Sequence, residues 1–405
     1  MSKVARQHLL MSRGPAVIDC VLTINAGSSS VKFALFALGG ALAAPLLAGQ
    51  VEGLGSAPGA LTPALTHAQA LDQVLAQVAA AGGDWRVAAV GHRVVHGGAG
   101  FAEPALIDAA VLQALQALAA LAPLHQPHNL AGIAAARAAF PAVPQVACFD
   151  TAFHRSQPAV HQRFALPQHW HDAGLRRYGF HGLSYASITA QLEADEPALL
   201  AGRVVVAHLG NGASMCGMTG GQSVATTMSF SPLDGLTMGT RCGRIDAAAV
   251  LHLIQQHGLD ADAVADLLYR QSGLLGLSGL SADMRTLLAS PSPAAGLAID
   301  HFIETAVREL AGMAAALRGI DALVFTGGIG EHAAPLRARI IAAAGWMGLQ
   351  LAAQANAGGA RCINSADSAV QIRVLRTNEE AVIARQTLQA AGLVATDPPP
   401  RHGAP

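Results

Sequence analysis

Short apolar runs that end at glycine or polar residues recur along the chain, and they constrain its fold more than any other feature. Seven of them have the length and composition of buried strands. Strands that alternate with helical periodicity predict an α/β protein whose sheets are covered by helices. The predicted strands are residues 17–25, 31–38, 86–90, 144–150, 203–209, 321–326 and 370–375, and the predicted helices include 106–121, 294–318, 331–344 and 379–391.

Two segments of the chain resemble each other. VLTINAGSSSVKFALF starts at Val21 and VVVAHLGNGASMCGMTG starts at Val204, and each is a strand, a turn of glycine and polar residues, and a second apolar stretch. This similarity predicts two structurally alike domains. We expect an N-terminal extension at 1–16, a first domain at 17–150 joined by the C-terminal helix 381–396, a second domain at 151–380 and a tail at 397–405.

Composition and charge indicate which kinds of binding partner and which cell compartments are not expected. The 405 residues carry 25 Lys and Arg against 26 Asp and Glu, so no basic field for nucleic acid is expected. The most apolar helical stretch, 105–124, contains Asp108 and two glutamines, which predicts no membrane partner. A basic start interrupted by Arg13, Gly14 and Pro15 does not fit a secretory signal. Five cysteines without a CxxC pair predict reduced thiols in the cytoplasm.

Three glycine-rich turns at predicted strand ends suit phosphate groups. They are Asn25-Ala-Gly-Ser-Ser-Ser-Val-Lys32, the HLGNG turn at 208–212, and TGGIGEH at 326–332. Small residues let backbone N–H groups approach an anion, and the Lys32 ammonium can reach a terminal phosphate. P-loop, nucleophile-elbow and zincin motifs are missing from the sequence, and TGGIGEH lacks the third glycine of a Rossmann fingerprint. The three turns favour a nucleotide held between two domains.

Ten sequence blocks, in order from Val21 to about Gly392, resemble the acetate kinase family. They are NAGSSSVKF, GHRVVHGG, APLHQPHNL, CFDTAFH, RRYGFHGLSY, HLGNGAS, PLDGLTMGTR, SGLLGLSG, FTGGIGEH and TNEE. The resemblance implies two duplicated ribonuclease H-like domains of the actin and sugar-kinase type, with a catalytic cleft between the domains. It also implies the reaction acetate + ATP ⇌ acetyl phosphate + ADP, dependence on Mg²⁺ with Mn²⁺ as an alternative, and a homodimer.

The resemblance also implies roles for single residues. Asp150, His181 and Arg241 match catalytic residues, and Asn25 and Glu379 match magnesium ligands. Arg93 matches an arginine suited to grip a carboxylate through two parallel hydrogen bonds. Val95, Leu124, Phe180 and Pro232 match a small pocket for the acetate methyl group. The nucleotide side is matched by Lys32, His208, Leu209, Gly210, Asn211, Gly212, Asp283, Met284, Arg285, Gly328, Ile329, Gly330, Glu331 and His332.

The chain departs from the family pattern at several positions. Leu183 and Tyr185 stand in GFHGLSY where the family usually has Thr and His, and Arg244 adds a positive charge after Arg241. Two other functions remain open on the sequence. One is a propionate kinase, because one methylene in an apolar pocket changes discrimination by only about 1–3 kcal/mol. The other is an actin-like nucleotide switch without a small substrate.

Overall fold

A computed structural model describes residues 17–27, 30–39, 42, 44–54, 65–123 and 125–393 of the chain. The chain divides into two compact units, each described here by itself. Unit 1 takes in residues 1–152 and 378–405, and unit 2 takes in residues 153–377. The N-terminal extension and the C-terminal tail predicted from the sequence lie outside the described residues.

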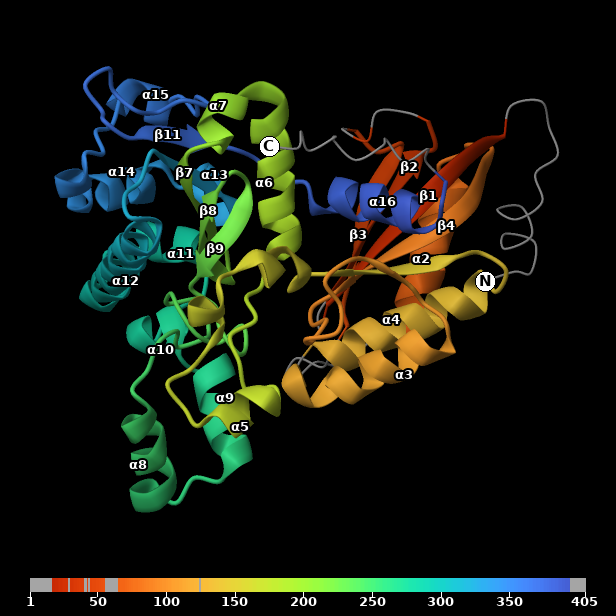
Figure 1. The fold of residues 1–405 in the computed structure, drawn as a ribbon, viewed down its shortest axis with the longest axis horizontal. Helices are drawn as coiled ribbons and strands as arrows, with labels where there is room; N and C mark the ends of the chain where they lie inside the picture. Colours follow the sequence, from red (N-terminus) through yellow and green to blue (C-terminus); the bar gives the residue numbers. More distant parts are fainter. Residues whose placement is uncertain are drawn as a thin grey trace, which may run out of the picture. The chain divides into compact units, whose positions relative to one another are not determined.

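Unit 1 is a mixed sheet covered on both faces. Its strands have the order β3-β2-β1-β4-β6-β5, in which β1, β2 and β3 are antiparallel and β4 and β6 run parallel to β1. Helix α16 packs on one face, while α2 and α4 pack on the other (Figure 1). The elements are β1 Ile18–Ala26, β2 Ser30–Ala37, β3 Leu47–Glu52, α2 His67–Ala80, β4 Trp85–Val94, β5 Ala105–Leu106, α3 Ala109–Ala117, α4 Gln126–Ala139, β6 Gln145–Phe149 and α16 Glu379–Ala390.

The C-terminal helix α16 packs closely on the sheet of this unit because a glycine in β4 leaves room for it. A Cβ added at Gly91 of β4 would lie 2.1 Å from Oγ1 of Thr387 in α16, so only glycine permits this approach. Buried Val21, Ala89 and Ala384 belong to the small apolar cluster between the sheet and the helix. The last helix among the described residues thereby packs against the sheet of the first unit.

Unit 2 repeats the same strand pattern. Its order is β11-β10-β7-β8-β9, with an antiparallel β7-β8-β9 meander and with β10 and β11 parallel to the first strand. Helix α6 covers one face through Tyr185, Ile188 and Leu192, and α12 contacts β7, β8 and β9. The elements are α5 Gln168–Asp172, α6 Gly182–Asp195, α7 Pro197–Leu200, β7 Arg203–Leu209, β8 Ala213–Thr219, β9 Gln222–Thr226, α8 Ala247–His257, α9 Ala261–Arg270, α10 Gly273–Ser278, α11 Met284–Leu288, α12 Pro293–Leu317, β10 Ala322–Thr326, α13 Gly327–His332, α14 Ala334–Ala343, α15 Ala353–Ala357 and β11 Gln371–Val374.

The shared pattern confirms the duplicated ribonuclease H-like topology. In both units a three-stranded antiparallel meander begins with the central strand, and two further strands add parallel to it. All seven predicted strands are present, with ends shifted by a few residues. Two predicted helices are interrupted: 106–121 begins with the short strand β5, and 331–344 is split at Ala333, two residues before Pro335, into α13 and α14.

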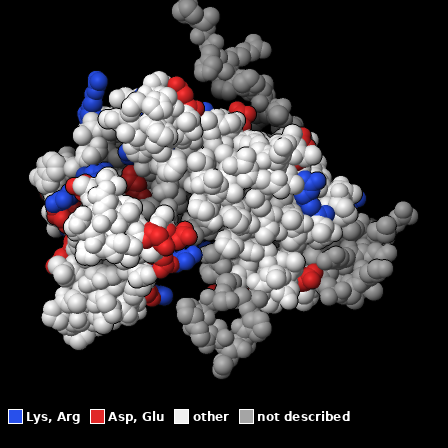
Figure 2. All heavy atoms as spheres, turned by 90° about the horizontal axis from the view of Figure 1, so that it is seen from below, with Lys and Arg blue, Asp and Glu red and all other residues white. Residues whose placement is uncertain are grey.

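Charged side chains are sparse on the surface. Only 13% of the residues are charged, and on the face shown in Figure 2 acidic and basic groups stand in small clusters on an uncharged background. No helix among the described residues combines the length and apolar character needed to cross a bilayer. All five cysteines lie in the described part of the chain, and none is in a disulfide.

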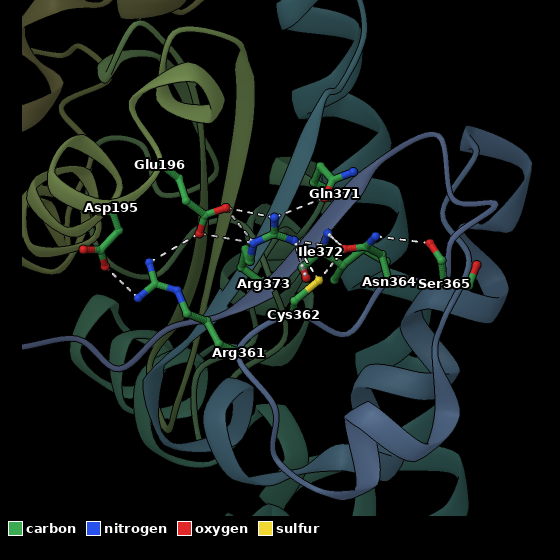
Figure 3. Close-up of polar contacts among 9 residues, drawn as sticks. All are labelled: Asp195, Glu196, Arg361, Cys362, Asn364, Ser365, Gln371, Ile372 and Arg373. Carbon is green, nitrogen blue, oxygen red and sulfur yellow. Dashed lines mark hydrogen bonds and ion pairs between the residues drawn. The ribbon is translucent and has the colours of Figure 1, made fainter.

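One charged network anchors the edge strand β11 in unit 2. Arg373 of β11 donates to Glu196 Oε2 at 2.9 Å from Nε and to Asn364 Oδ1 at 2.9 Å from Nη1, so it stands at the centre of the network in Figure 3. Arg361 pairs with Asp195 at 2.7 Å. These contacts tie β11 and the loop before it to the end of α6.

Candidate active site

Strand alternation brings four polar side chains to one edge of the sheet in unit 1. Successive side chains of a strand point to opposite faces. Positions 21, 89 and 148 face α16, as their contacts with that helix and its cluster show. Asn25, Arg93 and Asp150 follow these positions at even spacing, so they lie on the same face near the strand ends. Lys32 of β2 pairs directly with Asn25 in the register.

Arg93 is held by a nearly buried carboxylate. Its Nη2 lies 2.6 Å from Asp150 Oδ2 and its Nε lies 3.1 Å from the same oxygen. Nη1 donates to Asn25 Oδ1 at 3.2 Å. Burial opposes the charge of Arg93, but Asp150 and Glu379 outweigh it and raise the pKa of the guanidinium above its usual value. The Arg93 side chain is 22% exposed and the Asp150 side chain is 1% exposed. Asp150 therefore fixes the orientation of the guanidinium, while part of the Arg93 side chain stays accessible to solvent.

Glu379 opens α16, one residue after its N-cap, Asn378. Burial, together with the neighbouring carboxylates of Asp150 and Glu380, raises the pKa of Glu379 to about 7, although Arg93 and Lys32 oppose the shift. Burial disfavours the ionised carboxylate most strongly, and the two cations offset only part of this effect. An added divalent cation would favour ionised Glu379 for the same electrostatic reason.

The oxygen donors of this edge fit magnesium. Mg²⁺ prefers carboxylate and amide oxygens and completes its shell with water and phosphate. Asn25 Oδ1 and the Glu379 carboxylate supply two such donors. Among the described residues no group of three His, Cys, Asp or Glu side chains forms a closed metal site. A magnesium site with only two protein ligands agrees with the two oxygen donors and with the lack of a three-residue cluster among the described residues.

Asn129 was missed in the sequence analysis. This side chain of α4 is 3% exposed, and its Oδ1 accepts from Val95 N at 3.0 Å while its Nδ2 donates to Ala26 O at 2.8 Å. It therefore connects the ends of β1 and β4, one residue beyond Asn25 and two beyond Arg93. The residue lies in the block APLHQPHNL, but the spacing gave no sign that it would link two strands.

The predicted acyl-pocket residues belong to both units. Val95 of unit 1 is 5% exposed, and Phe180 of unit 2 is 1% exposed. Pro232 of unit 2 accepts a hydrogen bond from Arg241 through its carbonyl oxygen at 2.5 Å. Leu124 lies outside the described residues. The methyl pocket stays a prediction.

In unit 2 the same alternation gathers histidine and serine side chains beneath α6. Val206 of β7 and Cys216 of β8 pack in the cluster under this helix. His208 and Ser214, two residues away on each strand and paired with each other in the register, lie on that face. His181, the residue before α6, stacks on His208 with ring centroids 4.3 Å apart. Its Nδ1 lies 2.8 Å from Ser214 Oγ.

The HLGNG turn brings Arg241 to the same histidine. A Cβ added at Gly212 would lie 2.7 Å from Arg241 Nη2 and 3.4 Å from His181 Nε2. The guanidinium, the imidazole and the turn therefore meet at one point. Asn211 belongs to this turn, and its carbonyl accepts from Gly239 N at 3.0 Å. Leu209 is fully buried, and Gly210 N donates to Gly212 O at 3.1 Å, which closes the turn.

The TGGIGEH segment follows β10 as the short helix α13. Glu331 folds back on the start of the segment and accepts from Gly327 N at 3.0 Å and from Thr377 N at 3.3 Å. Buried Arg337 of α14 donates to the carbonyls of Gly330 and Glu331 at 2.8 and 2.9 Å. Gly328 and His332 are exposed, and Ile329 is half-buried. Arg337 is a second residue that the sequence pattern did not reveal.

The predicted adenosine segment lies at the start of α11. Asp283 is its N-cap and accepts from Arg285 N at 3.0 Å. Its carboxylate also pairs with the guanidinium of Arg285 at 3.1 Å, and that guanidinium is 90% exposed. Hydrogen bonds from Arg285 lower the pKa of Asp283. Met284 is buried.

The repeated topology places the chain among duplicated ribonuclease H-like α/β proteins. The profile of the acetokinase family matches residues 20–385. An acetate kinase of Methylocella silvestris is 49% identical over 91% of this chain and 97% of its own length. An acetate kinase of Rhizobium meliloti is 47% identical over 92% of this chain and 98% of its own length. The chain belongs to the acetokinase family.

Solved structures agree with this assignment. A propionate kinase from Francisella tularensis is 36% identical, with a TM-score of 0.83 over 92% of this chain and 100% of the other. The acetate kinase of Porphyromonas gingivalis is 33% identical, with a TM-score of 0.81 over 92% and 100% of the two chains. Both relatives therefore share the fold over their full length.

Proposed function

We propose that this chain is an ATP:acetate phosphotransferase, which transfers the terminal phosphoryl group of ATP directly to a carboxylate oxygen of acetate. The observation that carries the proposal is its membership of the acetokinase family over nearly the whole chain, with relatives named acetate kinase at 45–49% identity. The polar clusters of the two units supply suitable side chains for this reaction.

Arg93 binds the acetate carboxylate. A planar guanidinium matches a carboxylate through two parallel hydrogen bonds, and Asp150 holds this guanidinium in place with three contacts. A simple carboxylic acid has a pKa near that of a glutamate, about 4.3, so acetate is already ionised at neutral pH. Asp150 therefore orients Arg93 and is not needed as a general base.

Arg241 and His181 stabilise the phosphoryl group during transfer. The transition state of phosphoryl transfer is loose, with charge spread over three equatorial oxygens. Arg241 Nη2 and His181 Nε2 both lie close to Gly212, where they can donate to such oxygens. The backbone of the turns 208–212 and 326–332, with Lys32 and His208, binds the phosphates. The segment Asp283–Arg285 contacts the adenosine.

Asn25 and Glu379 hold the magnesium ion that accompanies ATP, and Mn²⁺ can replace it. The ion neutralises phosphate charge when bound. Glu379→Gln keeps the shape of the side chain and removes its charge. We expect it to raise the Mg²⁺ concentration that gives half-maximal rate by about tenfold or more. Unchanged magnesium dependence would contradict this role.

Propionate is the second candidate substrate, since a structural relative is named propionate kinase. Val95→Ala enlarges the predicted methyl pocket by two carbon atoms. We expect the ratio of kcat/KM for propionate to that for acetate to rise in this variant, with the KM for ATP nearly unchanged. Equal losses for both acids would remove Val95 from the pocket.

We further propose that the protein is a cytoplasmic homodimer. Five free cysteines are compatible with a reducing compartment. Light scattering coupled to size-exclusion chromatography gives the mass directly, and a mass of one 41.2 kDa chain would refute the dimer.

Trapping the product tests the function. Purified protein with ATP, Mg²⁺ and acetate, followed by hydroxylamine, is expected to give acetohydroxamate in proportion to ADP. ADP and phosphate formed without hydroxamate, at a rate independent of acetate, would instead favour the actin-like nucleotide switch.

A further inference from the structure

A buried chain of hydroxyl groups ends on His181 in unit 2. The Tyr185 hydroxyl of α6 lies 2.5 Å from Ser214 Oγ, and Ser214 Oγ lies 2.8 Å from His181 Nδ1. Tyr185 and Ser214 are both 0% exposed. The three side chains form a line from the core of the unit to the imidazole ring.

The direction of these hydrogen bonds follows from the number of protons that the three side chains can donate. Burial raises the pKa of Tyr185 well above its ordinary value, so the phenol keeps its proton. In the part of the chain that the structure describes, Ser214 is the one hydrogen-bond partner of this hydroxyl. The phenol therefore donates to Ser214 Oγ, because a buried O–H group left without an acceptor is unfavourable.

The Ser214 hydroxyl has one proton to donate, and its oxygen already accepts the proton of Tyr185. The serine oxygen has two lone pairs, but its own proton needs an acceptor, and His181 Nδ1 is the one that the described contacts of Ser214 offer besides Tyr185. The serine hydroxyl therefore donates to His181 Nδ1, while Tyr185 donates to the serine oxygen. The opposite direction would have His181 donate to Ser214 and Ser214 donate to Tyr185, which leaves the phenol proton buried without an acceptor. A nitrogen that accepts carries no proton, so the proton of His181 lies on Nε2.

We propose that Tyr185 and Ser214 are positioning residues that keep His181 neutral, with its proton on Nε2. That nitrogen lies near Gly212 together with Arg241 Nη2. His181 also has a left-handed backbone, with φ of 57°, an arrangement that is uncommon outside glycine. In the proposed phosphotransferase, on which this last step rests, Nε2–H donates to an oxygen of the phosphoryl group. Tyr185, whose hydroxyl donates to Ser214, stands at a position where the family usually has histidine.

Nitrogen NMR of the imidazole tests the proton position without any need for activity. The ¹⁵N signals of His181, assigned by their loss in His181→Gln, are expected to show protonated Nε2 and bare Nδ1 in the intact protein. In Ser214→Ala, Nδ1 loses the hydroxyl that donates to it, so a fraction protonated at Nδ1 is expected. Ser184→Ala is the matched comparison, since Ser184 Oγ bonds to His208 Nδ1 at 2.8 Å and its removal should shift His208 signals more than those of His181.

Kinetics separate positioning from general stability. We expect kcat to fall about tenfold in Ser214→Ala and about threefold in Tyr185→Phe, with KM values for acetate and ATP changed less than twofold. Tyr178→Phe is the control, because its hydroxyl donates to Gly174 O at 2.8 Å and is not part of the line from Tyr185 through Ser214 to His181. Its kcat should stay unchanged.

Protonated Nδ1 in the intact protein would overturn the inference, as would identical His181 signals in Ser214→Ala. If Ser214→Ala does not fold, the spectrum of the intact protein still decides. Absence of acyl phosphate formation would refute the proposed function and leave the proton position to the spectrum.

Discussion

Arg93 and Arg241 are both cations, but their surroundings differ, and the proposed roles of the two side chains differ with them. Arg93 is fixed by Asp150 and Asn25 in unit 1, whereas Arg241 donates to the Pro232 carbonyl and lies at the HLGNG turn of unit 2. A contact made equally in the ground and transition states changes KM, and one made only in the transition state changes kcat. Arg93→Ala should therefore raise the KM for acetate at least about tenfold, and Arg241→Ala should lower kcat by about 10³.

Two controls make this comparison sharp. Arg241→Lys keeps the charge and should recover little, because an ammonium cannot make two parallel hydrogen bonds. Arg308→Ala removes an exposed arginine paired with Glu304 and should leave both constants unchanged. Near-normal kcat in Arg241→Lys would show that charge alone suffices. Arg93→Ala also leaves buried Asp150 without its cation, so the melting temperature of that variant must be measured alongside.

At the scale of single residues, the sequence indicated candidate site residues only where they stand in a recognisable motif. His181, Arg241 and Arg93 stand in blocks that match the family, but Asn129, Ser214 and Arg337 matter through contacts with segments far away in the chain. A single sequence shows periodicity and turns, and it does not show which buried polar side chain meets which backbone group.

At the scale of elements, the glycine at the last position of the turn between β7 and β8 leaves room for the Arg241 guanidinium. Gly212→Ala would place a methyl group 2.7 Å from Arg241 Nη2, so the guanidinium must move. We expect kcat to fall at least about tenfold while the fold persists. Gly312→Ala is the matched control, because a Cβ there in α12 meets no atom within 4 Å and should slightly stabilise the helix. Equal activity in the two variants would contradict the close approach.

Helix α13 is held by an arginine of α14 that the sequence pattern did not reveal. Arg337 is 2% exposed and holds two carbonyls of α13 as well as Asn356, so Arg337→Ala should lower the free energy of unfolding by about 3 kcal/mol and weaken ADP binding. Arg339→Ala on the same helix removes an exposed ion pair with Asp300 and should change stability by less than about 0.5 kcal/mol. Calorimetry with and without ADP measures both effects, and similar melting temperatures would refute the assignment.

Strands were easier to predict than helices for a physical reason. A strand buried on both faces is a continuous apolar run, and all seven such runs became strands. The run 331–344 keeps helical periodicity across Ala333, but Pro335 lacks the N–H group that a continuous helix needs. Its break is therefore visible in the sequence only when the proline is weighed against the periodicity.

For the whole molecule, the duplicated hairpins predicted the duplicated fold, and the strand order of both units confirms it. The C-terminal helix α16 lies in unit 1, and Gly91 shows the close packing that permits it. The catalytic cleft between the domains stays a prediction.

Acid stability also belongs to the whole molecule. Burial lowers the pKa values of His92, His96 and His154 to about 4, below the ordinary 6.5. The unfolded chain takes up these protons first, so stability is full above pH 6.5 and falls as the pH drops toward 4. Glu379, with its raised pKa, acts in the opposite direction below pH 7, but one group cannot offset three. We expect the melting temperature to fall steadily between pH 6.5 and 4.5, and a flat profile would contradict the buried neutral histidines.

The central claim is that an oxygen of acetate attacks the terminal phosphorus of ATP, and isotope transfer tests it most directly. The protein is supplied with ATP, Mg²⁺ and acetate labelled with ¹⁸O, and the acyl phosphate is then cleaved at carbon by hydroxylamine. The released phosphate should contain one ¹⁸O atom, the former bridging oxygen, and the nucleotide product should be ADP. Unlabelled phosphate, or AMP in place of ADP, would contradict direct transfer to the carboxylate.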